Sequence, residues 1–363
     1  MCARFPPGLR VCQPRVGILG QVIDWKLAGT VARGVANLQP AGNPEPFEQL
    51  AEPAAEAERL VSAYTGLVAA QPVPAAEAVE RPGWIDANLA SLETVLAPAT
   101  ERINGKLGPL SVVAGGVMAI EAGAISGFLA GRVLGQYEFP VLEPDKPARL
   151  LFVTPNLAQA AEALEADADQ LLRWVALHEM THALQFGGVP WLREHLASML
   201  RELLGALQMN PASLLRVPDL TDLRGMLERV REDGLATVMI GESQRGTLDR
   251  VQAFMAVLEG YAEHVMDAVG ADVLDDLPAL RGAMSRRRRD RPGLLKILDR
   301  LIGMNLKLKQ YELGKQFCDG VVARAGIDGL NRVWIAPETM PTWAELSDPA
   351  GWLARTERVE PAF

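Results

Sequence analysis

Cysteine is scarce in this chain. Only three cysteines occur among the 363 residues, Cys2, Cys12 and Cys318. An odd number of cysteines with no close pair excludes the disulfide framework typical of small secreted domains. The N-terminal segment also lacks an apolar run long enough for a signal peptide before its prolines interrupt it. We therefore expect a protein of the reducing cytoplasm.

The chain also lacks an excess of positive charge. It carries 36 lysines and arginines against 45 acidic residues, a net charge of -9 at pH 7. A surface of this sign excludes a general affinity for nucleic acid or for an anionic membrane. Hydrophobic residues make up 49% of the chain, which is typical of a globular protein with a sizeable core.

Strand-like alternation is rare along the sequence. The first third predicts helices over residues 24–37, 46–67 and 83–96, separated by prolines. Two short apolar runs follow, at 139–142 and 149–154, and the turn-forming segment between them predicts a hairpin. Asn156 then follows as a candidate helix cap. The predicted fold class is mainly α with a small β element.

One stretch, residues 110–131, is apolar enough to resemble a membrane span, apart from Glu121. Small residues recur along it at every fourth position, at Gly115, Ala119, Gly123, Gly127, Gly131 and Gly135. Such a stripe lets another helix backbone approach closely. Because Glu121 interrupts this single stretch and Arg132 follows it, we expect a buried helix and no membrane span. A membrane anchor remains the alternative.

Histidine is also scarce, and half of the histidines belong to one motif. Four histidines occur, and His178 and His182 form an HExxH pattern with Glu179. On a helix, residues four apart lie on one face, so both imidazoles can bind one tetrahedral zinc ion while Glu179 stands beside its water. Apolar residues at helical spacing precede the motif, and Gly187 with Gly188 can end the helix. The motif predicts two zinc ligands and a base.

A catalytic zinc site needs a further protein ligand. The metzincin pattern is excluded because Gln185 and Gly188 occupy the positions where it requires glycine and histidine. We therefore place Glu259 first, within the helical segment 258–270, with Gly260 expected to let this helix approach the HExxH helix. Glu263, one turn later, could accept the free N–H of a ligand histidine. His195, His264 and Glu263 itself remain alternative ligands.

These groups together suit the hydrolysis of a peptide or amide substrate. Zinc would activate water and polarise the carbonyl, while Glu179 would carry a proton from the water to the leaving amine. The developing oxyanion would need a further hydrogen-bond donor. The candidates are Tyr311, Tyr261, His264 and His195, and their positions in the sequence favour none of them over the others. Residues 149–154 are a candidate edge strand for an extended substrate.

The chain resembles a family of zincin-like hydrolases that is labelled as associated with deazaflavin-coenzyme biosynthesis. The resemblance spans nearly the whole chain and rests on segments that include GRVLGQYEFP, LLFVTPNL, LHEMTHALQFGGVPWLREHL, LEGYAEHVMDAVG and GLNRVWIAPETMPTWAEL. It implies a zincin-like metallopeptidase architecture of gluzincin type, with His178 and His182 as zinc ligands, Glu179 as base and Glu259 as third ligand. The label does not name a reaction.

We expect a helical N-terminal lobe over residues 1–140 and a zinc-site lobe over residues 141–363, joined as one structural unit. Two other functions remain open at this point. One is a zinc-bearing scaffold without catalysis, which a closed fourth coordination position would indicate. The other is a membrane-associated protease anchored by residues 110–131.

Overall fold

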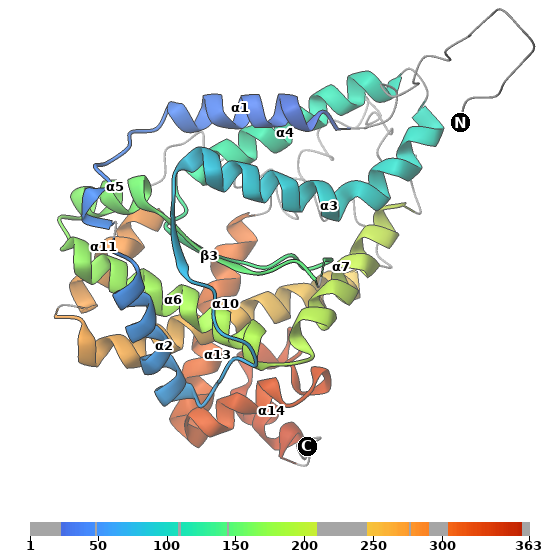
Figure 1. The fold of residues 1–363 in the computed structure, drawn as a ribbon. Helices are drawn as coiled ribbons and strands as arrows, with labels where there is room; N and C mark the ends of the chain where they lie inside the picture. Colours follow the sequence, from blue (N-terminus) through green and yellow to red (C-terminus); the bar gives the residue numbers. More distant parts are fainter. Residues whose placement is uncertain are drawn as a thin grey trace, which may run out of the picture.

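The structure is a computed structural model that describes residues 23–47, 49–107, 110–143, 145–208, 245–275, 277–289 and 304–357. Helices surround a small sheet near the middle of the molecule (Figure 1). This confirms the predicted fold class. Cys2 and Cys12 lie outside the described residues.

Three helices pack together on one side of the sheet: α1 (Trp25–Asn37), α3 (Arg81–Leu107) and α4 (Leu110–Ala130) (Figure 1). Helix α4 contacts α1 through its small residues. A Cβ atom at Gly127 would lie 2.2 Å from the carbonyl oxygen of Ala32, and one at Gly123 would lie 2.4 Å from that of Ala28. The stripe of small residues therefore provides the predicted close approach. Among the helices in the described ranges, none is long and apolar enough to cross a membrane.

The sheet has three strands, β1 (Ala76–Val79), β2 (Gly135–Glu138) and β3 (Arg149–Val153), in the order β1-β3-β2. Strand β2 pairs antiparallel with β3, which confirms the hairpin, although β2 precedes the predicted run at 139–142. Strand β1 pairs parallel with the other side of β3. The prediction that residues 149–154 form an edge strand is therefore wrong. The edge that faces the HExxH helix belongs to β2.

Alternate residues of β3 enter different cores. Leu150 and Phe152 pack into a large core with α2 (Ala51–Thr65), α6 (Ala168–Gly188), α10 (Arg245–Val273) and α13 (Met304–Leu330). Leu151 and Val153 pack into a smaller core with α1, α3 and α4. The two-residue period of a strand explains the division. Helix α2 and strand β1, which precede residue 140, contact α6 and β3, which follow it. The lobe boundary at residue 140 stays a prediction.

A buried polar pair joins the two sides of the sheet. Arg81, at the start of α3, donates from Nε to Oδ1 of Asn156 at 2.7 Å. Asn156 lies in α5 (Thr154–Leu164) and donates from Nδ2 to the carbonyl oxygens of Ala130 and Val133. The prediction that Asn156 caps this helix is wrong, because its side chain is used for these long-range contacts and Val153 takes the cap position.

Helices α10 and α13 cross at two glycines. A Cβ atom at Gly260 would lie 2.3 Å from the carbonyl carbon of Gly314, and one at Gly314 would lie 1.9 Å from the carbonyl oxygen of Ala256. The absence of a side chain at Gly260 therefore allows the backbone of α13 to approach α10 closely. The prediction that it admits the HExxH helix is wrong, because α10 contacts α6 through a different face.

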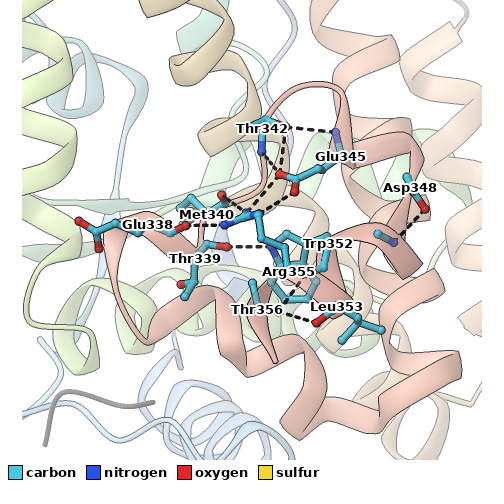
Figure 2. Close-up of polar contacts among 11 residues, drawn as sticks. Glu338, Thr339, Met340, Thr342, Glu345, Asp348, Trp352, Leu353, Arg355 and Thr356 are labelled. Atoms are coloured by element: carbon cyan, nitrogen blue, oxygen red, sulfur yellow. Dashed lines mark hydrogen bonds and ion pairs between the residues drawn. The ribbon is translucent and has the colours of Figure 1, made fainter. Parts of the chain in front are cut away.

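The end of the described chain folds back on α13. Helix α14 (Pro349–Thr356) carries Trp352, which is fully buried, with its ring 5.2 Å from that of Phe317. Figure 2 shows Arg355 donating to the carboxylate of Glu345 and to the carbonyl oxygens of Glu338 and Met340. The remaining elements are η1 (Glu45–Phe47), α7 (Leu192–Gln208), α11 (Leu277–Arg289), η3 (Asn331–Trp334), η4 (Pro337–Thr339) and η5 (Glu345–Ser347).

Candidate metal centre

Helix α6 places the two histidines of the HExxH pattern on one face. The Nε2 atoms of His178 and His182 are 3.2 Å apart, and their rings meet edge to face at 4.7 Å between centroids. A separation of four residues on a helix with 3.6 residues per turn explains this arrangement. The side chain of His178 is 21% exposed and that of His182 is 14% exposed, so solvent reaches both rings.

Helix α10 brings Glu259 to the same point. Its Oε2 atom lies 3.7 Å from Nε2 of His178, and its Oε1 atom lies 3.8 Å from Nε2 of His182. One ligand atom from each of these three side chains lies within 4.8 Å of the others. The structure therefore brings together two helices that are about 80 positions apart in the sequence, at the residues expected to share a metal.

The separations fit a tetrahedral zinc ion. Ligand atoms about 2.0–2.1 Å from zinc lie roughly 3.3 Å from one another. The observed separations are 3.2, 3.7 and 3.8 Å. Two imidazoles and one carboxylate are also a ligand set that suits zinc and leaves a position for water. His178, His182 and Glu259 could therefore hold the metal.

Gln185 determines which nitrogen of His182 faces this point. Its Oε1 atom lies 2.9 Å from Nδ1 of His182, and its Nε2 atom donates to the carbonyl oxygen of Leu258 at 3.3 Å. An amide oxygen only accepts, so Nδ1 of His182 carries the proton and the Nε2 lone pair is left for a metal. Gln185 is fully buried. Its place one turn after His182 is the sequence signal for this contact, although a core glutamine could occur at the same spacing.

Glu179 lies beneath strand β2. Its Oε2 atom accepts a hydrogen bond from the backbone N–H of Tyr137 at 2.8 Å. Gly135 makes this approach possible, because a Cβ atom there would lie 2.7 Å from Cγ of Glu179. Burial raises the pKa of Glu179 to about 7, although His182 and the Tyr137 N–H lower it. A carboxyl group with a pKa near neutrality can both accept and release a proton at that pH.

These groups open into a cavity of about 300 Å³. Its polar end is formed by His178, Glu179, His182 and Glu259, and side chains of β2, α6, α7 and α10 form its walls. The edge of β2 and the metal ligands therefore face one space. A substrate in that space would be within reach of both.

Glu263 follows Glu259 by one turn, as the sequence requires, and lines a second cavity of about 50 Å³. Trp174, Asp267 and Lys315 line the same cavity. Asp267 and Lys315 form an ion pair, with 2.9 Å between Oδ2 and Nζ. The role of Glu263 as a partner of a ligand histidine stays a prediction.

The other candidate histidines and Tyr261 lie outside the lining of the larger cavity. His264 uses both ring nitrogens, at 2.9 Å from the Tyr64 hydroxyl and 2.7 Å from Oδ1 of Asp319. The Tyr261 hydroxyl donates to Asn331 at 2.7 Å. His195 packs against the rings of Trp191 and Phe254, and burial lowers its pKa. The geometry therefore gives no support to these three residues as ligands or as oxyanion donors.

Tyr311 belongs to helix α13, but its side chain lies outside the described residues. Its role as an oxyanion donor stays a prediction. Cavity residues that the motif did not single out include Tyr137, Phe139 and Phe186. Only Phe186 had a local signal, since it lies one turn after His182 on the same helix.

The chain is similar to known proteins over most of its length. The model of the zincin-like metallopeptidase family matches residues 23–353. The chain is also similar to a crystal structure from Chloroflexus aurantiacus, described provisionally as a hydrolase with a novel fold. The two share 30% sequence identity and a TM-score of 0.70, over 93% of this chain and 100% of the other. No curated protein matches the chain. Because the family match covers most of the chain, from residue 23 to residue 353, this chain belongs to the zincin-like metallopeptidase family.

Proposed function

We propose that the protein is a zinc-dependent hydrolase that cleaves peptide or amide bonds. The observation that carries this proposal is the convergence of His178, His182 and Glu259 beside the buried carboxyl of Glu179. When bound, zinc supplies a Lewis acid that activates water and polarises a carbonyl group. The similar protein from Chloroflexus aurantiacus, provisionally a hydrolase, supports the same reaction class.

In this proposal, Glu179 moves the proton. Its carboxylate accepts a proton from the attacking water and delivers it to the nitrogen of the leaving amine. The Tyr137 N–H holds Oε2 of Glu179, so Oε1 is the oxygen left to face the water. Gln185 holds the ring of His182 in the orientation that a metal ligand needs.

Strand β2 orients the substrate. Among the described strands only β3 pairs with its backbone, and its other side faces the cavity. The Tyr137 N–H on this side already donates to Glu179. An extended peptide can add to such an edge through its remaining backbone groups, independently of the peptide sequence. The scissile amide would then lie above the two histidines.

The test combines metal content with activity. Purified protein should bind one zinc ion and hydrolyse members of a peptide library, and Glu179→Gln should lower kcat by on the order of 1,000-fold or more while still binding zinc. The matched control is Glu162→Gln, since Glu162 is exposed on α5. Equal activity of Glu179→Gln and wild type would contradict the proposal. Zinc binding without hydrolysis of any peptide or amide would favour the scaffold.

A further inference from the structure

An aromatic wall stands beside the candidate metal centre. The ring of Tyr137 lies 5.9 Å from that of Phe139 and 6.5 Å from that of Phe186, and Phe139 and Phe186 are 3.9 Å apart. Tyr137 belongs to β2, Phe139 is the first residue after the end of that strand, and Phe186 belongs to α6. Because β2 and α6 also hold Glu179, the wall has a fixed position relative to the proposed reacting atoms.

Aliphatic side chains line the rest of the cavity. Leu258 directly precedes the proposed ligand Glu259 on α10, Met255 lies one turn earlier on the same helix, and Leu196 comes from α7. Methionine adapts its shape to different apolar partners. The cavity thus has a rigid aromatic side and an adaptable aliphatic side.

Among the described residues that line the cavity, only those of the metal centre carry a charge. Apart from His178, Glu179, His182 and Glu259, the only other residue with a strongly polar side chain among the described lining residues is Gln136. Its amide is already used, since Trp84 Nε1 donates to its Oε1 at 2.6 Å and its Nε2 donates to Asn88 at 3.2 Å. A charged group that entered would lose water without gaining a partner, whereas an apolar group would gain from burial.

We propose that this cavity binds a bulky apolar side chain of the substrate, on the residue beside the scissile amide. Leucine, methionine and phenylalanine are the side chains that fit this chemistry. A volume of about 300 Å³ is at the lower end for ligand sites, which suits one side chain with its adjoining backbone. That the bound side chain belongs to a substrate rests on the proposed function.

A binding experiment tests the pocket without catalysis. Zinc-loaded Glu179→Gln protein with ¹³C-methyl methionine would be titrated with N-acetyl-phenylalaninamide, N-acetyl-leucinamide, N-acetyl-lysinamide and N-acetyl-alaninamide. The methyl signal of Met255, assigned with a Met255→Leu variant, should shift with the phenylalanine and leucine probes. These should bind at least about tenfold more tightly than the lysine probe. Equal binding of the lysine probe, or no shift of Met255, would overturn the proposal.

A substitution at the aliphatic side tests selectivity. Leu196→Arg adds a cation to the lining, so the ratio of kcat/KM for glutamate-containing over phenylalanine-containing peptides should rise by about tenfold or more. The matched control is Leu38→Arg, because Leu38 is 84% exposed and lies outside the cavity lining. Circular dichroism would establish that both variants are folded. An unchanged ratio in folded Leu196→Arg would overturn the proposal.

The two experiments separate failure of the pocket from failure of the proposed function. Selective binding of the apolar probes with no hydrolysis of any peptide would support the pocket and contradict the hydrolase. Hydrolysis without preference between apolar and charged side chains would support the hydrolase and overturn the pocket.

Discussion

Gln185 shows how a residue outside the HExxH pattern can control a ring within it. Its amide oxygen faces Nδ1 of His182, and its amide nitrogen donates to the Leu258 carbonyl oxygen on α10. One side chain therefore fixes the tautomer of a proposed ligand and ties α6 to the residue before Glu259. Contacts of this kind contribute to metal affinity although they do not touch the metal.

We expect Gln185→Leu to weaken zinc binding by about 10–100-fold. Leucine has a similar size but cannot accept from Nδ1, so the ring of His182 loses its fixed orientation. Competition with a zinc chelator would measure the change, and thermal unfolding of the metal-free protein would show whether the fold persists. The control is Gln316→Leu at an exposed position of α13. An affinity equal to that of wild type would contradict the role given to Gln185.

We expect Gly135→Ala to lower kcat by on the order of 100-fold with little change in zinc content. The added Cβ would lie 2.7 Å from Cγ of Glu179 and 2.9 Å from Cγ1 of Val175, so the carboxylate must move. Peptide hydrolysis and metal analysis would be measured on the same sample. Gly34→Ala is the control, because nothing lies within 4 Å of a Cβ at that position. Full activity of Gly135→Ala would show that the position of Glu179 is not critical.

At the scale of elements, helix α10 connects the metal centre to the core. One face presents Glu259 to α6, and another crosses α13 at Gly260 and Gly314. Backbone-to-backbone contact at this crossing leaves α10 little freedom to move. The position of Glu259 therefore depends on a helix that contributes no ligand.

We expect Gly260→Ala to lower the free energy of unfolding by about 1–3 kcal/mol and also to weaken zinc binding. A Cβ at this position would lie 2.3 Å from backbone atoms of Gly314, so α10 and α13 must separate. Gly246→Ala on the same helix is the control, since its Cβ would meet nothing within 4 Å. Denaturant unfolding and zinc competition measure the two effects. A stability equal to that of Gly246→Ala would contradict the close crossing.

The hydrogen bonds of Glu345 indicate that the free energy of unfolding depends on pH. Burial opposes ionisation of Glu345, but hydrogen bonds from Arg355 and Thr342 outweigh it and lower its pKa in the folded state (Figure 2). A lowered folded pKa contributes stability above the unfolded pKa of about 4.3, and this contribution is lost as pH falls through the folded pKa.

We expect Glu345→Gln to reduce the free energy of unfolding by about 1–2 kcal/mol at pH 7, and by much less at pH 3. The reason is that only the carboxylate accepts charge-assisted hydrogen bonds from Arg355. Denaturant unfolding at both pH values measures the difference, with Glu312→Gln at an exposed position as control. An equal loss of stability at pH 3 and pH 7 would contradict this account.

At the scale of the whole molecule, a three-stranded sheet separates two cores, and the candidate metal centre lies at its β2 edge. The HExxH helix, its end at Gly188 and the long helix that carries Glu259 could be predicted from local signals of spacing and glycine. The stripe along α4 also predicted a close helix contact.

Other features depend on contacts that no local pattern encodes. Strand β1 has four residues and only its pairing with β3 makes β3 central, so the edge strand could not be identified from the sequence. Gly260 signalled a close approach without naming its partner. The sequence makes His264 a candidate for the site. It lies on a different face of α10 from Glu259, however, and its ring contacts Tyr64 and Asp319.

The most direct measurement is anomalous diffraction at the zinc edge from a crystal of the zinc-loaded protein. We predict one peak at about 2.0–2.2 Å from Nε2 of His178, Nε2 of His182 and a carboxylate oxygen of Glu259, with a water molecule at the remaining position. A peak elsewhere, or a zinc ion with four protein ligands and no open position, would contradict the account.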